Sequence, residues 1–481
     1  MPPAVDRSDP MIEAANPVAG RELSRLVGAL GLKEHAAGCA VRIVGDDFPQ
    51  ISPHRLATAS AVAIAAHAVA VAGVWRFRGG KGQEIRVETA RALQALRSYT
   101  YVQQNDAPVS EGPGKSGLRF HRTRDRRWIY ITGDHQRGHF LDAALELLQV
   151  PNAHAAVAAA VAKWDGEALE DALTERKVPA ALVRTEAEWR EHPHGRWLAA
   201  RPLVEIEKIA DGPPMPLGEA ERPLSGLRVL DMAHVICGPT VARFMAEQGA
   251  DVLHVSRPYG ADSNAVSWDT GWGKRHAVAD LRRAGDDERL RALAGDCDMF
   301  VQSWRPGALD RHGFSPKDLS AIRPGIIYVS ASCYGSGGPW GDRGGYDPNS
   351  QTATGLVHGE SFEGPPRMAR TVTVNDYLTA YLGAAGALAA LLRRAREGGS
   401  YRVSVALAAS GMWVQSLGLM PEAQEFAALP YGDPVEPHRI AMASAFGTLS
   451  GLAPAAEYSE TPAYAARPPE PPGASPLQWL D

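Results

Sequence analysis

One carboxylate, Asp376, stands where a polar, strand-like stretch gives way to a long apolar helix in TVTVNDYLTAYLGAAGALAALLRR (371–394). An aspartate at such a position can cap the helix, because its oxygens accept hydrogen bonds from the free N–H groups of the first turn. It can also act as a nucleophile, since the same N–H groups keep it ionised and can stabilise an oxyanion. The stretch by itself leaves both roles open.

An internal repeat bears on that choice. Two stretches, AIAAHAVAVAGVWRFRGGKGQEIRVETARAL and YLGAAGALAALLRRAREGGSYRVSVALAASG, each predict an apolar helix ending in Arg, a Gly turn, a strand and another helix. They superpose without a gap when Arg76 is placed on Arg394, a shift of 318 residues that also places Thr58 on Asp376. The alternative is two unrelated helix–turn–strand units. Because Thr is also a good N-cap, both copies can cap their helix. Capping alone therefore does not explain why only one copy has a carboxylate.

Composition narrows the class of protein. The chain has 481 residues, 45% hydrophobic and 22% charged, with a net charge of −5, which predicts two or three globular domains and no nucleic-acid partner. Its four cysteines are far apart, which disfavours a disulfide framework and a zinc site and fits a reducing cytoplasm. The N-terminus has no signal-peptide core. The apolar run 59–75 is short for a membrane span, so we expect a buried helix there and no membrane contact.

A small α+β region is predicted between the two copies. RFHRTRDRRWIYITG (119–133) predicts a hairpin with its turn at 124–127, GHFLDAALELLQV and AHAAVAAAVAKWDGEALEDALTER predict helices, and KVPAALVRT predicts a strand. The predicted organisation is an N-terminal segment (1–40), a partial degenerate copy (41–115), a small α+β domain (116–210), a Pro-rich linker (211–226), a larger α/β domain (227–415) and a Pro-rich C-terminal segment (416–481). The tail of that last segment, SETPAYAARPPEPPGASPLQWLD, is expected to pack along a surface or to be partly flexible.

From Leu227 onward, apolar strands alternate with amphipathic helices. LRVLDMA, DVLHVS, DMFVQSW and GIIYVSASCYG predict strands, and PTVARFMAEQGA and DERLRALAGD predict helices. This alternation is typical of an α/β fold with a parallel sheet and helices on both faces.

Several motifs of familiar binding and catalytic sites are incomplete or absent in this sequence. The first strand of the larger domain is followed by AHVICGPTVA, with a lone glycine, so a dinucleotide site is disfavoured. GPGKSG (112–117) lacks the first glycine of a P-loop and follows no clear strand. HPHG (192–195) offers two imidazoles to a metal, but we expect a surface loop there. The G-x-S-x-G motif of serine hydrolases is absent.

An ordered run of motifs over residues 223–411 resembles the class III CoA-transferase family. PLSGLRVLDMAHVICGPTVARFMAEQGADVLHVSRP resembles its opening strand, helix and second strand, and GWGKRHAVADLRR and VQSWRPGALDRHGF resemble two later elements. SASCYGSGGPWGDRGGYDPNSQTATGL matches its Gly-rich strand end, and VTVNDYLTAYLGAAGALAALL matches the helix start that carries its catalytic aspartate. Residues 41–210 resemble the family's later portion, so the chain looks rearranged or fused. The resemblance implies a Rossmann-like parallel-sheet domain plus a smaller α+β domain.

The resemblance also implies a reaction. The aspartate attacks an acyl-CoA thioester, a mixed anhydride forms, and CoA then attacks the aspartyl carbonyl to give an enzyme–CoA thioester that an acceptor carboxylic acid discharges. A carboxylate suits this role because its anhydride is as reactive as the thioester that it replaces. Coenzyme A is therefore expected as co-substrate, without a metal. The expected partners are an acyl-CoA and a carboxylic acid, and the expected assembly is a homodimer or an intramolecular equivalent in the cytoplasm.

Site residues are carried over position by position. Arginine suits phosphate because its fork makes two hydrogen bonds, and Trp304 offers a face to adenine. The alternative for each arginine is a solvated face, and Lys274 has a structural alternative. The resemblance implies Asp376 as nucleophile, Ile236, Arg257, Lys274, Ala279, Arg282, Trp304 and Arg311 as CoA contacts, and Gly133, Tyr346 and Asp347 in the acyl pocket.

Two other functions stay open. The racemase branch of the family has a His where this chain has Tyr346, and a phenol with an ordinary pKa near 10 is a poor base, which favours transfer over racemisation. A non-catalytic CoA-binding paralogue is the other alternative. The segment ITGDHQRGH (131–139) has only two glycines where transferases of the family often carry a run of them, and no sequence feature identifies the acyl group.

Overall fold

The largest sheet of the computed structural model has seven strands in the order β12–β11–β10–β13–β14–β15–β9. The structure describes residues 11–35, 38–109, 117–133, 138–259, 262–362, 364–426 and 431–480. The strands of this sheet are β9 (Glu205–Ala210), β10 (Arg228–Asp231), β11 (Asp251–Ser256), β12 (Arg275–Val278), β13 (Met299–Gln302), β14 (Ile327–Ser332) and β15 (Ser400–Ala406).

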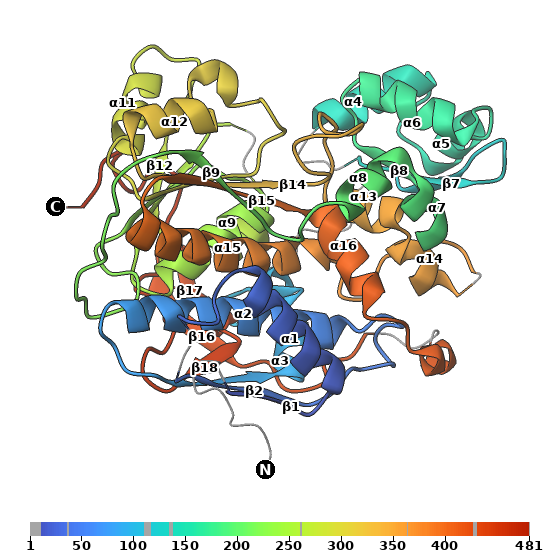
Figure 1. Cartoon of the computed structure of the whole chain (residues 1–481). Helices are drawn as coiled ribbons and strands as arrows, with labels where there is room; N and C mark the ends of the chain where they lie inside the picture. The colour runs from blue at the N-terminus through green and yellow to red at the C-terminus, as the bar shows by residue number, and fades with distance from the viewer. Residues whose placement is uncertain are drawn as a thin grey trace.

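Six of these strands are parallel, as the alternation of strands and helices predicted. Helices cover both faces, which confirms the predicted fold class: α9 and α15 lie on one face and α11 and α12 on the other (Figure 1). Their bounds are α9 (Cys237–Ala246), α11 (Asp286–Ala294), α12 (Pro316–Ile322) and α15 (Asn375–Glu397), with α10 (Asn264–Gly271), α13 (Asp347–Thr354), α14 (Leu356–Ser361) and α16 (Leu407–Ser416) beside them. The antiparallel edge strand β9 was not predicted.

A second sheet, β1–β2–β3–β18, lies against the first through two long helices. Its elements are β1 (Met11–Ala14), α1 (Pro17–Ala29), β2 (Ala40–Val44), α2 (Leu56–Phe77), β3 (Glu84–Glu88), α3 (Thr89–Ala95) and β18 (Ala456–Tyr458). The order β1–α1–β2–α2–β3–α3 matches the order β13–α12–β14–α15–β15–α16 once α13 and α14, which are inserted between β14 and α15, are set aside. Three parallel strands occur in each series. Moved by 318 residues, the ends of α2 fall within two residues of those of α15.

Helices α2 and α15 pack side by side and run in the same direction. The ring of His67 lies 6.0 Å from that of Tyr381, and farther along the pair Gly73 faces Leu392. Within the part of the chain that the structure describes, α2 is the one helix long and apolar enough to cross a membrane, and its apolar window is wholly buried inside the protein. The predicted buried helix is therefore confirmed.

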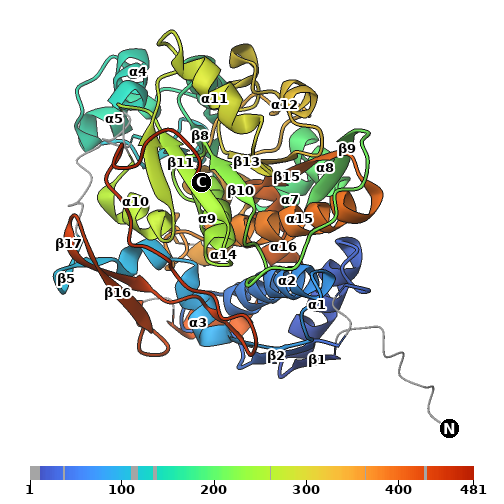
Figure 2. The same ribbon diagram turned by 90° about the vertical axis from the view of Figure 1, so that its left-hand side faces the viewer.

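Two hairpins and the C-terminal segment join the two halves of the chain. Strand β17 (Gly447–Leu452) pairs with β16 (Arg439–Ser444) and also with β4 (Gln103–Gln104), which in turn pairs with β5 (Ala107–Pro108); Figure 2 shows β5, β16 and β17 side by side. Beyond β18 the chain runs over the larger sheet, where the Trp479 indole donates to the Leu293 carbonyl. The Pro-rich segment thus packs along a surface, one of its two predicted states.

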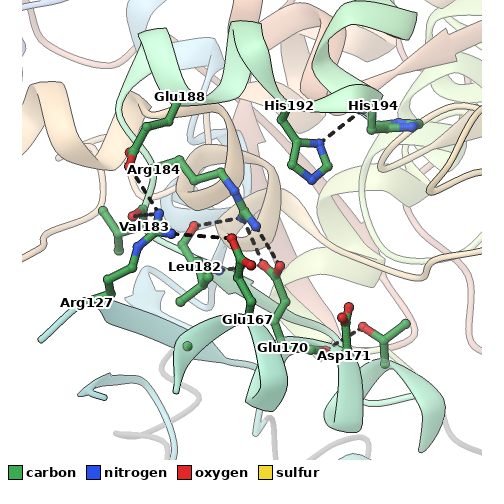
Figure 3. A network of polar contacts seen from close by, with 12 residues as sticks. Arg127, Glu167, Glu170, Asp171, Leu182, Val183, Arg184, Glu188, His192 and His194 are labelled. Atoms are coloured by element: carbon green, nitrogen blue, oxygen red, sulfur yellow. Dashed lines mark hydrogen bonds and ion pairs between the residues drawn. The ribbon is translucent and has the colours of Figure 1, made fainter. Parts of the chain in front are cut away.

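The remaining sheet, β6–β7–β8, has its own helices and is called the three-stranded unit here. Its elements are β6 (Phe120–Arg122), β7 (Trp128–Ile131), α4 (Gly138–Leu148), α5 (His154–Val161), α6 (Gly166–Glu175), β8 (Ala180–Leu182), α7 (Glu186–Glu191) and α8 (Pro193–Ala199). The predicted hairpin is confirmed. A buried pair, Glu170 on α6 and Arg184 after β8, ties the helix to the sheet (Figure 3).

The HPHG segment is not the predicted surface loop. His194 is fully buried, its Nε2 lies 2.7 Å from the carbonyl oxygen of Tyr334, and the Trp340 N–H donates to its Nδ1 at 3.1 Å. Burial lowers the pKa of His194 to about 4, which leaves a neutral ring that donates from one nitrogen and accepts at the other. His194 therefore anchors α8 to the loop that follows β14.

Candidate active site

Asp376 is the second residue of α15, and a different carboxylate caps the helix. The residue before the helix, Val374, makes no side-chain cap. Instead Oδ2 of Asp347, on α13, accepts the N–H groups of Val374 at 3.0 Å and Asp376 at 2.8 Å. Since Asp347 fills the capping role, the carboxylate of Asp376 is left for another use.

Two neighbours decide the charge state of Asp376. Burial, and then the negative charge of Asp347, raise the pKa of Asp376 well above its ordinary value, while a hydrogen bond from the Cys237 N–H acts in the opposite direction. Burial also raises the pKa of Asp347, but Gln351 and the backbone N–H groups of α15 favour its charged form. Asp376 is consequently a carboxylate of raised basicity, and the Cys237 backbone beside it at the cavity favours its ionised form.

A cavity of about 470 Å³ opens onto Asp376 at the carboxyl ends of the parallel strands, where ligands of open α/β sheets bind. Of the predicted site residues, Arg257, Trp304, Arg311, Tyr346 and Asp376 line this cavity. Val235 and Cys237, on either side of the predicted Ile236, line it too, whereas the Ile236 side chain is buried outside it.

The three-stranded unit closes one side of the cavity. His139 and Phe140 on α4, with Lys177 and Pro179 before β8, line the space that Asp376 faces. His139 ends the segment 131–139 that was compared with the glycine run of the family, whereas no motif marks Phe140, Lys177 or Pro179.

Trp304, which is predicted to stack on the adenine of CoA, already contacts two other side chains. The ring of His234 stacks on Trp304, with centroids 4.1 Å apart and an interplanar angle of 11°, and the guanidinium of Arg257 lies 4.8 Å from the Trp304 centroid. The Trp304 indole also donates to the Met232 carbonyl at 2.7 Å. An adenine would have to share the Trp304 ring with these two side chains, so stacking stays a prediction.

Comparison with known proteins shows the family to which this chain belongs. The model of CoA-transferase family III matches residues 35–217 and 224–451, which is most of the chain. The chain belongs to CoA-transferase family III. It is 34% identical over 282 residues to an acetyl-coenzyme A transferase of Hypoxylon pulicicidum, covering 54% of this chain and 47% of that protein.

Other relatives align over similar parts. A succinyl-CoA:glutarate CoA-transferase of Mus musculus is 30% identical over 193 residues, covering 37% of this chain and 44% of that protein. A CaiB/BaiF family protein from Brucella suis, known as a crystal structure, is 26% identical with a TM-score of 0.38, covering 48% of this chain and 65% of that one. The chain spans about half the length of the curated relatives it matches.

Besides Ile236, five predicted site residues of this family III member do not line the cavity. The Lys274 ammonium is 2% exposed, pairs with Asp231 at 2.7 Å and does not line the cavity, so it supports the sheet, and its CoA contact stays a prediction. Arg282 is 65% exposed and pairs with Asp280. Ala279 is buried at the end of β12, where its N–H donates to the Ser256 carbonyl.

The other two are Asp347 and Gly133, which were predicted to lie in the acyl pocket and do not line the cavity. Asp347, predicted to line the acyl pocket, is buried behind Asp376 as the cap of α15. Gly133 ends the described part of the segment after β7 and does not line the cavity, while residues 134–137 of the predicted glycine-poor segment lie outside the described residues.

The charge of Asp347 is expected to set the acid limit of activity. In Asp347→Asn the like-charge repulsion disappears, so the pKa of Asp376 falls and the ionised nucleophile persists to lower pH. The acid limb of the kcat/KM profile should therefore move to lower pH relative to wild type. A limb that stays in place or moves upward in a variant of unchanged melting temperature would contradict this assignment.

Proposed function

We propose that this chain is a CoA-transferase that moves CoA from an acyl-CoA to a carboxylic acid through an aspartyl-CoA thioester on Asp376. The observation that carries the proposal is the freedom of Asp376 from capping: it is a buried carboxylate of raised pKa, facing a 470 Å³ cavity with a backbone donor beside it. The activities named for the relatives are consistent with this reaction.

In the first step a carboxylate oxygen of Asp376 attacks the thioester carbonyl carbon, and the C–S bond breaks to release CoA thiolate. The thiolate then attacks the Asp376 carboxyl carbon of the mixed anhydride and expels the donor's carboxylate. An acceptor carboxylate then attacks the carbonyl carbon of the aspartyl thioester, which releases CoA thiolate and forms a second mixed anhydride. The thiolate attacks the acceptor's carbonyl carbon in that anhydride, which gives the new acyl-CoA and regenerates the Asp376 carboxylate. Each carbonyl attack places negative charge on an oxygen, and the Cys237 N–H is the backbone donor beside Asp376 that would stabilise it.

Tyr346 lines the cavity at the position where the racemase branch has a His, which favours transfer over racemisation, although the imidazoles of His139 and His234 line the same cavity. The proposed reaction uses one site per chain, because Thr58, the counterpart of Asp376 in the repeat, is fully buried between Asp47 and Asn16. A homodimer and a cytoplasmic location stay predictions.

The direct test is intact-protein mass spectrometry after incubation with a panel of acyl-CoAs, followed by peptide mapping. A CoA-sized adduct on Asp376, absent from Asp376→Ala and discharged by a carboxylic acid, is the expected result. An Asp376→Ala variant that still binds CoA, together with a wild type that forms no adduct with any donor, would favour the non-catalytic paralogue.

Arg311 is expected to bind a phosphate of CoA, because it lines the cavity at an exposed position. Arg311→Ala should weaken CoA binding by roughly 10- to 100-fold, the equivalent of a charge-assisted hydrogen bond of about 1.5–3 kcal/mol. Titration calorimetry with CoA measures this. Arg196→Ala is the matched control, since Arg196 is also exposed to solvent but pairs with Glu191 outside the cavity; an equal loss in that variant would show that the phosphates bind elsewhere.

A further inference from the structure

The turn between β10 and α9 presents the backbone that faces Asp376, and it is strained. Val235 has a φ of +64°, in the left-handed region that β-branched residues rarely adopt. Ile236 and Cys237 follow directly, Cys237 lines the same cavity as Asp376, and its N–H favours the ionised form of that carboxylate. The direction of that donor therefore depends on a backbone conformation that valine does not favour by itself.

Two side chains hold this turn from different sides. Oδ2 of Asp262 accepts the Val235 N–H at 2.7 Å. The Ser303 hydroxyl, at the end of β13, accepts the His234 N–H at 3.0 Å and donates to the His234 carbonyl at 2.9 Å. Ser303 lines the cavity of Asp376, but Asp262 does not.

Asp262 acts on the turn from behind. It borders a separate small space of about 30 Å³ that Asp376 does not line, and Val235 borders both that space and the larger cavity. The next residue, Ser263, caps α10 by accepting the Val266 N–H, which fixes Asp262 at the start of a helix. Asp262 thus meets the strained residue from a position outside the substrate space.

We propose that Asp262 is a positioning residue: it holds Val235 in the left-handed conformation and so keeps the Cys237 N–H aimed at the carboxylate that reacts. The inference rests on the proposed function of Asp376. It assigns no contact between Asp262 and CoA or the acyl group.

The first test compares Asp262→Ala with wild type in transfer kinetics. Misplacing a transition-state donor costs about 10²-fold, so kcat should fall by about that factor while the dissociation constant for CoA changes by less than about twofold. Because the Cys237 N–H favours the ionised form of Asp376, its loss should also move the acid limb of kcat/KM to higher pH. Asp262→Asn keeps an oxygen acceptor and should recover most of kcat.

A glycine variant separates this role from a general effect on folding. Glycine adopts positive φ without a steric penalty, so a turn with Val235→Gly needs the Asp262 carboxylate less. In that background, Asp262→Ala should lower kcat at least tenfold less than it does in wild type. Asp318→Ala is the matched control, since Asp318 also accepts a backbone N–H at a helix start but lies on α12, outside the cavity.

The outcomes are distinguishable. A wild type without transfer would overturn the proposed function and this role with it. With an active wild type, an Asp262→Ala variant that keeps kcat within threefold would overturn the inference alone. So would an equal loss in the Val235→Gly background, or a loss of CoA affinity that matches the loss of kcat.

Discussion

Asp376→Asn is expected to lower kcat for CoA transfer by about 10⁴-fold or more, because removing a covalent nucleophile removes the pathway that depends on it. Asparagine has nearly the same shape, and the cap of α15 is supplied by Asp347, so the helix start should be preserved. The dissociation constant for CoA should change little. Steady-state kinetics with a donor found by mass spectrometry, together with CoA titration, measure both quantities.

The variant also carries a stability signature. Asp376 is buried with a raised pKa, so its ionised form costs folding free energy, and a neutral amide removes that cost. We therefore expect the melting temperature of Asp376→Asn to equal or exceed that of wild type near neutral pH. A variant that is inactive and also strongly destabilised would point to a structural role for this carboxylate.

Glu170→Ala is expected to destabilise the protein by about 3–5 kcal/mol, because it leaves the Arg184 guanidinium buried without its partner (Figure 3). The pair is bidentate, with distances of 2.9 Å and 2.6 Å, and Glu170 also accepts the Leu182 N–H at 2.7 Å. Urea unfolding followed by far-UV circular dichroism measures the loss. Glu167→Ala is the control, because Glu167 lies on the same helix but is 79% exposed.

The same pair gives a pH dependence of stability. Burial opposes ionisation of Glu170, but the hydrogen bonds and charge of Arg184 outweigh it and hold the pKa of Glu170 below its ordinary value. The stabilisation is therefore present above the ordinary pKa of a glutamate and is lost as the pH falls through the lowered pKa of the folded state. Glu170→Ala should remove this part of the acid sensitivity; an unchanged acid transition would contradict the assignment.

Local patterns predicted the elements of this fold, and long-range contacts decided the site. The strand from Arg228 to Asp231 and the hairpin at Phe120 were predictable because their periodicity and turn residues lie within a few positions. Lys274 shows the limit: its place in a motif predicted a CoA contact, but its environment is set by Asp231, 43 residues away. His194 gives a second example of this limit. The segment around it is polar in sequence, and His194 is buried because it hydrogen-bonds with Tyr334 and Trp340, which follow β14.

The candidate site divides in the same way. The helix start at Asp376 and the arginines of the cavity follow from sequence motifs, whereas the cap from Asp347 and the wall from the three-stranded unit follow from tertiary packing. The motif left Asp376 with two possible roles. Only the position of the second carboxylate shows which residue caps the helix.

The parallel pairing of α2 with α15 affects how this chain can vary. In a twofold-symmetric dimer of identical chains, every substitution at the contact occurs on both sides at once. Here the two contacting helices are encoded by separate codons, so a change in one leaves its counterpart unaltered. Thr58 and Asp376 occupy matching places with different side chains, so selection can act on Thr58 for packing and on Asp376 for chemistry independently.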